Sequence, residues 1–219
     1  MDRSGTGCPR FLLLLAMLLA TLPAISGCAS ALATAVYLVK GTNEDPEFTG
    51  LREKKVAVVC RPLVELQYRN ASVARDISHQ VVLRLKQNVR KIEVVDERKV
   101  AEWTDENAWD EYPEIGKAID ANLVLGIDLE EFSLYQGQTV YQGKATVSLK
   151  VYDCTTGEVV FQKRVPQVIY PPNRVVAASD VQENAFRQQF VGVLADQIGK
   201  LFYPYDRYTD FAMDSRSME

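Results

Sequence analysis

The stretch Tyr141 to Val165, YQGKATVSLKVYDCTTGEVVFQKRV, carries the clearest structural signal in the chain. Its first half alternates apolar and polar residues with a period of two, which is typical of a β-strand with one buried and one wet face. The polar turn DCTTGE then reverses the chain, and Gly157 can take the positive φ that such a turn needs. The pattern predicts an antiparallel hairpin with an inner face made of Tyr141, Ala145, Val147, Leu149 and Val151.

The residues on either side extend this hairpin into a larger unit. NLVLGIDLEEFSLYQ, residues 122 to 136, begins fully apolar and becomes alternating, so it predicts a third strand, and Gly137 marks the turn that follows. Downstream, Ser179 or Asp180 is expected to cap a helix that runs to about Leu201. The predicted core stripe of that helix is Phe186, Phe190, Val193, Leu194, Ile198 and Leu201.

The upstream half predicts a β-α-β start. VAVVC, residues 56 to 60, is a continuous apolar run of the kind found in a strand buried on both faces. A helix capped by Asn70 or Ser72 follows, and residues 92 to 95 form a second short strand. Asp96 is expected to start a short helix, residues 104 to 114 a loop, and residues 115 to 121 a further helical turn. The apolar positions of the first helix are Val73, Ile77, Val81 and Leu85.

These elements predict one α/β domain, with α+β as the alternative, over residues 54 to 203. It has a mixed β-sheet with a parallel βαβ start, an antiparallel C-terminal meander and covering helices. Residues 28 to 53 are predicted to be an N-terminal segment and linker, and residues 204 to 219 a polar-aromatic tail.

Composition narrows the classes of function. The chain has 219 residues and a net charge of -4, which gives no electrostatic reason to bind nucleic acid. One histidine and four cysteines without C-x-x-C spacing make a zinc centre unexpected, and no other metal or cofactor is indicated. Hydrolase and nucleotide-binding motifs are absent, so no catalytic residue is assigned. A disulfide between Cys60 and Cys154 is an alternative that the sequence leaves undecided if the compartment is oxidising.

The N-terminus resembles a bacterial lipoprotein signal. Arg3 and Arg10 precede an apolar block of 12 residues, Phe11 to Leu22, and Ile25-Ser26-Gly27-Cys28 follows as a lipobox. The resemblance implies that residues 1 to 27 are a signal peptide and that Cys28 becomes the acylated first residue, held by membrane lipid. Ala29 is not the aspartate of inner-membrane retention, so a periplasm-facing anchor in the outer membrane is favoured. The alternative is a single-pass anchor, because residues 11 to 39 carry no charge.

The domain also resembles a known group. VAVVC, EVVDE, DANLVLGID and the hairpin VYDCTTGEVVFQ are similar to the periplasmic lipoprotein domains related to the curli-secretion protein CsgG, the penicillin-binding-protein activator LpoB and the N-terminal domain of TolB. The alternating strand is too short for the hairpin of a secretion pore. The resemblance therefore implies a non-catalytic protein-interaction domain with a role in envelope assembly or regulation.

Two alternatives stay open at this level. Asp128 and Glu130 lie on the polar face of a predicted strand and would serve an envelope hydrolase, since two carboxylates suffice for glycoside hydrolysis. A small-ligand or glycan sensor would use exposed aromatic residues, which also mark partner surfaces. The aromatic candidates for a surface that binds an envelope protein are Trp103, Trp109, Tyr112, Tyr203, Tyr205 and Tyr208.

Overall fold

The computed structural model describes residues 43 to 62 and 67 to 206, with the side chains of the first helix described from Ser72 onward. The predicted signal peptide (residues 1 to 27), Cys28 and Tyr208 lie outside the described residues. Of the helices in the described part, none combines the length and the apolar composition needed to cross a membrane.

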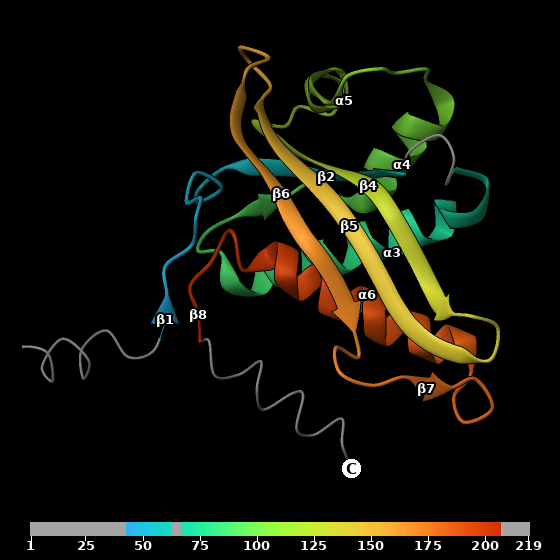
Figure 1. Cartoon of the computed structure of the whole chain (residues 1–219). Coiled ribbons are helices and arrows are strands. Elements are labelled where there is room, and N and C mark those ends of the chain that lie inside the picture. The colour runs from blue at the N-terminus through green and yellow to red at the C-terminus, as the bar shows by residue number, and fades with distance from the viewer. Residues whose placement is uncertain (1–42, 63–66, 207–219) are drawn as a thin grey trace, which may run out of the picture.

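A mixed sheet forms the centre of the molecule (Figure 1). Its strand order is β3-β2-β4-β5-β6, and β2 runs parallel to both β3 and β4, whereas β4, β5 and β6 form an antiparallel meander. The parallel start and the antiparallel end predicted from the sequence are confirmed as an α/β fold. The strands are β2 (Lys55–Pro62), β3 (Glu93–Val94), β4 (Leu123–Gln136), β5 (Val140–Asp153) and β6 (Val159–Tyr170), and β7 (Val176–Ala177) pairs with the start of β5.

Both predicted turns form as expected. Gly137 and Gly157 adopt φ values of +76° and +80°, which residues with a side chain rarely take. In the second turn the Asp153 carboxylate accepts hydrogen bonds from the backbone N–H groups of Thr155 and Thr156, at 2.8 and 3.2 Å. The short polar sequence DCTTGE therefore fixes the register of β5 against β6.

Helices cover the two faces of the sheet unequally. α3 (Gln67–Asn88) and α6 (Glu183–Gly199) lie side by side on one face and bury Leu125, Ile127 and Leu129 in the main core. On the other face, α4 (Glu97–Glu106) and α5 (Tyr112–Ala118) cover a smaller cluster over β2 and the first part of β4. The part of this second face that α4 and α5 do not cover carries polar, partly exposed side chains.

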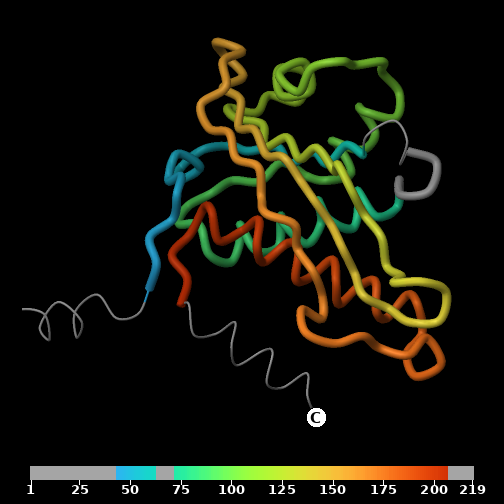
Figure 2. The backbone as a smooth tube through the Cα atoms, in the orientation of Figure 1, coloured from blue at the N-terminus to red at the C-terminus, as the bar shows by residue number. Residues whose placement is uncertain are grey.

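The domain is longer than predicted at both ends. β1 (Asn43–Glu44) pairs antiparallel with β8 (Tyr205–Asp206), and Figure 2 shows the two described ends side by side. Leu51 is fully buried in the main core, and the Phe48 ring stacks on Phe161 at 5.0 Å. Residues 43 to 53 are therefore part of the domain rather than a free linker. The predicted tail, which starts at residue 204, begins too early, because residues 205 and 206 form a strand.

Four helix boundaries also differ from the predictions. α3 begins at Gln67, ahead of the expected cap at Asn70 or Ser72, and α6 begins at Glu183, after Gln182, and lacks a side-chain cap. The predicted loop of residues 104 to 114 is largely the end of α4 and the start of α5. Asp96 caps α4 as predicted, since its side chain accepts a hydrogen bond from the N–H of Arg98.

Candidate functional site

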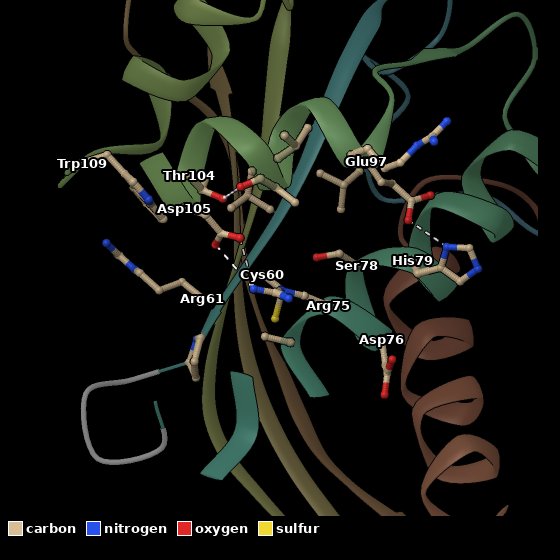
Figure 3. A pocket seen from close by; sticks show the side chains of 17 residues that line it. Cys60, Arg61, Arg75, Asp76, Ser78, His79, Glu97, Thr104, Asp105 and Trp109 are labelled. Atoms are coloured by element: carbon tan, nitrogen blue, oxygen red, sulfur yellow. Dashed lines mark hydrogen bonds and ion pairs between the residues drawn. The ribbon is translucent and has the colours of Figure 1, made fainter. Parts of the chain in front are cut away.

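A groove of about 740 Å³ lies between α3 and α4, beside the carboxyl half of β2 (Figure 3). The topology creates it: the chain leaves β2 for α3 on one face of the sheet and leaves β3 for α4 on the other. Crevices of this kind, at the carboxyl ends of parallel strands, are where α/β folds bind their ligands.

The inside of the groove is apolar and lined by small side chains. Residues 58 to 60 of β2 form its floor, Ala74 and Ser78 of α3 one wall, and Ala101 and Thr104 of α4 the other. Because the wall residues are small, the space between the helices stays unfilled. The groove thus presents an apolar surface with room for side chains that come from outside the domain.

Two ion pairs cross the rim and join the helices (Figure 3). The Arg75 guanidinium lies 3.3 Å from the Asp105 carboxylate, and Nδ1 of His79 lies 2.7 Å from Oε2 of Glu97. His79 is half-exposed on α3, and its close partner is a carboxylate rather than a nucleophile. The charged residues that line the groove balance, with Arg61, Arg75 and Arg98 against Asp76, Glu97 and Asp105.

Arg61 connects one end of the groove to the second core cluster. Its guanidinium lies over the Trp109 and Tyr112 rings, at 5.2 and 5.0 Å from their centroids, and donates to Oδ1 of Asp128 at 3.3 Å. The Tyr112 hydroxyl donates to the same Oδ1 at 2.8 Å. Burial, and then the Asp128 charge, raise the pKa of Tyr112, so this tyrosine stays protonated and acts as a hydrogen-bond donor.

The two described cysteines are free thiols, and no disulfide joins them. Cys60 packs against the main core and Cys154 lies in the second cluster, so they sit on opposite faces of the sheet. Burial raises the pKa of Cys154 to about 11, and burial together with the Asp128 charge raises the pKa of Cys60. A thiol with a raised pKa is a poor nucleophile at neutral pH.

The carboxylates of the hydrolase alternative are held by separate partners. Asp128 is held by Arg61 and Tyr112, whereas Glu130 accepts hydrogen bonds from Ser148 and, at 2.7 and 3.0 Å, from Arg164. The bonds from Arg164 and Ser148 lower the pKa of Glu130. A general acid for glycoside hydrolysis needs a raised pKa, so this arrangement suits a structural ion pair better than acid catalysis.

The predicted aromatic surface does not form as one patch. Tyr112 and Tyr203 are buried, which corrects their assignment to a surface, and Trp103, Trp109 and Tyr205 are half-buried. Tyr112 turns inward over Gly126, where a Cβ would come within 2.8 Å of the ring. The two tryptophans pack against the second cluster, while Tyr205 packs against the main core.

Acidic residues near the groove do not form a metal site. Across residues 43 to 62 and 67 to 206, no group of histidine, cysteine, aspartate and glutamate side chains is placed to hold a metal ion. Sequence reasoning missed Arg61, the residue that organises the end of the groove. A usable signal was its position, directly after the apolar run of residues 56 to 60 and before Pro62.

The sequence matches no protein-family model and no curated protein. Among solved structures, it is similar to the PelC dodecamer from Paraburkholderia phytofirmans, with a TM-score of 0.43 and 13% identity over 74% of this chain and 95% of that one. It is also similar to lipoprotein GNA1162 from Neisseria meningitidis, with a TM-score of 0.41 and 10% identity over 66% and 96%. The LpoB C-terminal domain from Salmonella enterica is similar with a TM-score of 0.38 and 13% identity, over 55% of this chain and 84% of that one. Likenesses at these TM-scores define no family for the chain.

Proposed function

We propose that the chain is a bacterial envelope lipoprotein, anchored through acylated Cys28, whose α/β domain binds a partner protein and catalyses no reaction. The groove between α3 and α4 carries the binding part of this proposal. Its rim charges pair with one another, as in Arg75 with Asp105, and its inner surface is apolar. A surface of this kind offers shape and apolar contact to a partner.

The anchoring part rests on the sequence. The lipobox Ile25 to Cys28 follows a basic start and an apolar block of signal-peptide length. A lipid-anchored domain of this type faces the periplasm, and the residue after the cysteine, Ala29, favours the outer membrane. A membrane-held binding domain without catalytic groups suits a role in envelope assembly or regulation.

Metabolic labelling with a radioactive fatty acid tests the anchor. The wild type should incorporate label, and Cys28→Ala should lose it. Cys8→Ala is the matched control, because Cys8 lies within the proposed signal peptide and its loss should leave labelling of the mature chain unchanged. Equal labelling of the wild type and Cys28→Ala would contradict the proposal. An unlabelled wild type that stays in the membrane would instead support the single-pass anchor.

Site-specific photo-crosslinking in cells tests the groove. A photo-reactive amino acid at Ala101, inside the groove, should capture a discrete partner. The same amino acid at Glu102 is the control, since that residue is exposed on the same helix and does not line the groove. Capture that is equal at both positions, or absent from Ala101, would contradict a partner site in the groove.

A small-ligand or glycan sensor is the second candidate function. The groove volume of about 740 Å³ falls within the range of small-molecule sites, about 300 to 1,000 Å³, and the aromatic ring of Trp109 borders it. Such a sensor would be stabilised by a metabolite or glycan in a thermal-shift screen and would show no groove-dependent protein capture.

A further inference from the structure

One edge of β2 is paired over only two of its eight residues. β3 lies beside Lys55 and Val56 and then ends, whereas β2 continues to Pro62 with β4 along its other side. In the described part of the chain, no strand takes over where β3 stops. The unpaired part of β2 runs along the floor of the groove (Figure 3).

The direction of the backbone groups follows from the hydrogen bonds that are made. The Val56 carbonyl accepts from Val95 N–H on the β3 side at 3.0 Å, and the Lys55 carbonyl accepts from Asn122 N–H on the β4 side at 2.8 Å. Alternate residues of a strand between parallel neighbours face alternate sides. Val58 and Cys60 therefore direct their N–H and C=O groups away from β4, into the space beyond the end of β3.

Within the described residues, β3 pairs only with Lys55 and Val56, and no backbone hydrogen bond outside the strand ladders involves Val58 or Cys60. Buried backbone N–H and C=O groups are nearly always paired, and an unpaired strand edge is a template for another strand. We call this set, the N–H and C=O groups of Val58 and Cys60, the free edge of β2. The groove therefore provides main-chain donors and acceptors at the spacing of a β-ladder.

We propose that the groove binds an extended peptide segment of a partner protein, which adds to the free edge of β2 as a further strand in line with β3. This proposal rests on the partner-binding function proposed above and specifies which kind of segment the partner contributes. Strand addition obtains affinity from main-chain hydrogen bonds and specificity from pockets for alternate side chains.

The lining specifies the chemistry of that segment. Side chains of an added strand would point alternately toward α3, at Ala74 and Ser78, and toward α4, at Ala101 and Thr104. Because the residues of these walls are small, the groove accepts side chains of the size of valine, threonine or leucine. The groove charges balance, so the segment is uncharged where it is enclosed. From residue 57 to residue 62 the strand extends for about 20 Å at about 3.3 Å per residue, which fits about four to six peptide residues.

A random octapeptide library on phage, selected on the full chain in detergent, tests the chemistry without assuming a sequence. The expected enrichment is for windows of about four to six uncharged, β-branched or aliphatic residues without proline, as a ladder strand requires. An absence of enriched peptides, or enrichment of charged ones, would overturn the proposal.

Hydrogen exchange followed by NMR then tests the mode of binding. A synthetic copy of an enriched peptide should slow exchange of the Val58 and Cys60 amides by about tenfold or more at saturation. The Val59 amide, which faces β4, is the internal control and should change little. Binding that leaves the amides of Val58 and Cys60 unprotected would refute strand addition.

Two variants tie binding to the edge and to the groove. Cys60→Pro removes a free N–H that faces away from β4, so it spares the ladder with β4, and peptide binding should weaken by at least about tenfold. Ala101→Trp fills the groove and should block binding, while Glu102→Trp on the exposed side of α4 should not. Circular dichroism confirms that each variant is folded. Equal binding by the two tryptophan variants would exclude the groove.

The outcomes separate this proposal from the function on which it rests. Crosslinking from Ala101 without protection of the free edge would retain a partner site and reject the added strand. Stabilisation by a small metabolite or glycan, without partner capture or peptide binding, would reject both.

Discussion

Asp128 on β4 holds two other elements, and its removal gives a sharp test of the network at the end of the groove. Its Oδ1 accepts from Tyr112 on α5 at 2.8 Å and from Arg61 on β2 at 3.3 Å. Asp128→Ala should therefore destabilise the domain, chiefly because it leaves the hydroxyl of the buried Tyr112 without an acceptor.

The magnitude follows from the two contacts. A buried hydroxyl left unsatisfied costs about 1–3 kcal/mol. The Arg61 pair adds about 0–1 kcal/mol, since the arginine side chain is 36% exposed and solvent screens the attraction. The expected loss is about 1–4 kcal/mol in the free energy of unfolding. Tyr112→Phe should cost about 1–2 kcal/mol in the wild type, but it should restore about 1–3 kcal/mol once Asp128 is alanine, because it then removes the unsatisfied hydroxyl.

Urea unfolding of the four proteins in this double-mutant cycle, followed by far-ultraviolet circular dichroism, measures the coupling. The expected coupling free energy is about 2–5 kcal/mol, the sum of the cost in the wild type and the recovery in Asp128→Ala. Tyr152→Phe is the matched control, because its ring lies 5.7 Å from that of Tyr112 and its hydroxyl makes no hydrogen bond to any described residue. If the losses from Asp128→Ala and Tyr112→Phe add to within about 0.3 kcal/mol, the hydrogen bond does not stabilise the domain.

Three further measurements probe packing and pH. Gly126→Ala should cost about 1–3 kcal/mol, because the new Cβ would meet the Tyr112 ring at 2.8 Å, whereas Gly192→Ala in α6, where the new Cβ would meet Nη2 of Arg84 at an ordinary contact distance of 3.9 Å, should stabilise by up to about 1 kcal/mol. Leu129→Ala should lower stability by about 2–5 kcal/mol in a urea titration, since the side chain is fully buried. Burial raises the pKa of Tyr112 above 10.0, so the unfolded chain loses this proton first. Stability should then fall as the pH rises above about 10, less steeply in Tyr112→Phe, and equal slopes would contradict this cause.

Local patterns predicted the strands well because the side-chain period of a strand is fixed. Ala145, Val147, Leu149 and Val151 are all fully buried, as the alternation in β5 required. The helix starts were less accurate. The predicted caps Ser179 and Asp180 lie before α6, which shows that an available capping side chain does not by itself set where a helix begins.

The groove and its network depend on pairing that local patterns do not contain. Arg61 and Asp128 are 67 positions apart and become neighbours only because β2 and β4 pair in parallel, in register at these residues. The free edge of β2 depends on β3 stopping at Val94, shorter than the predicted strand. Tyr112 was assigned to the surface, although a glycine inside a strand, here Gly126, signals the close approach of another group.

The pairing of β1 with β8 has a mechanical consequence. Asn43 lies opposite Asp206, so the chain enters and leaves the domain at the same end of this two-strand pair. A pull between those two points would load the pairs one at a time, as in the opening of a zipper, and the pair of Glu44 with Tyr205 would carry the force next. Tension transmitted from an N-terminal anchor would release this short pair first, before it reaches Leu51 and the core.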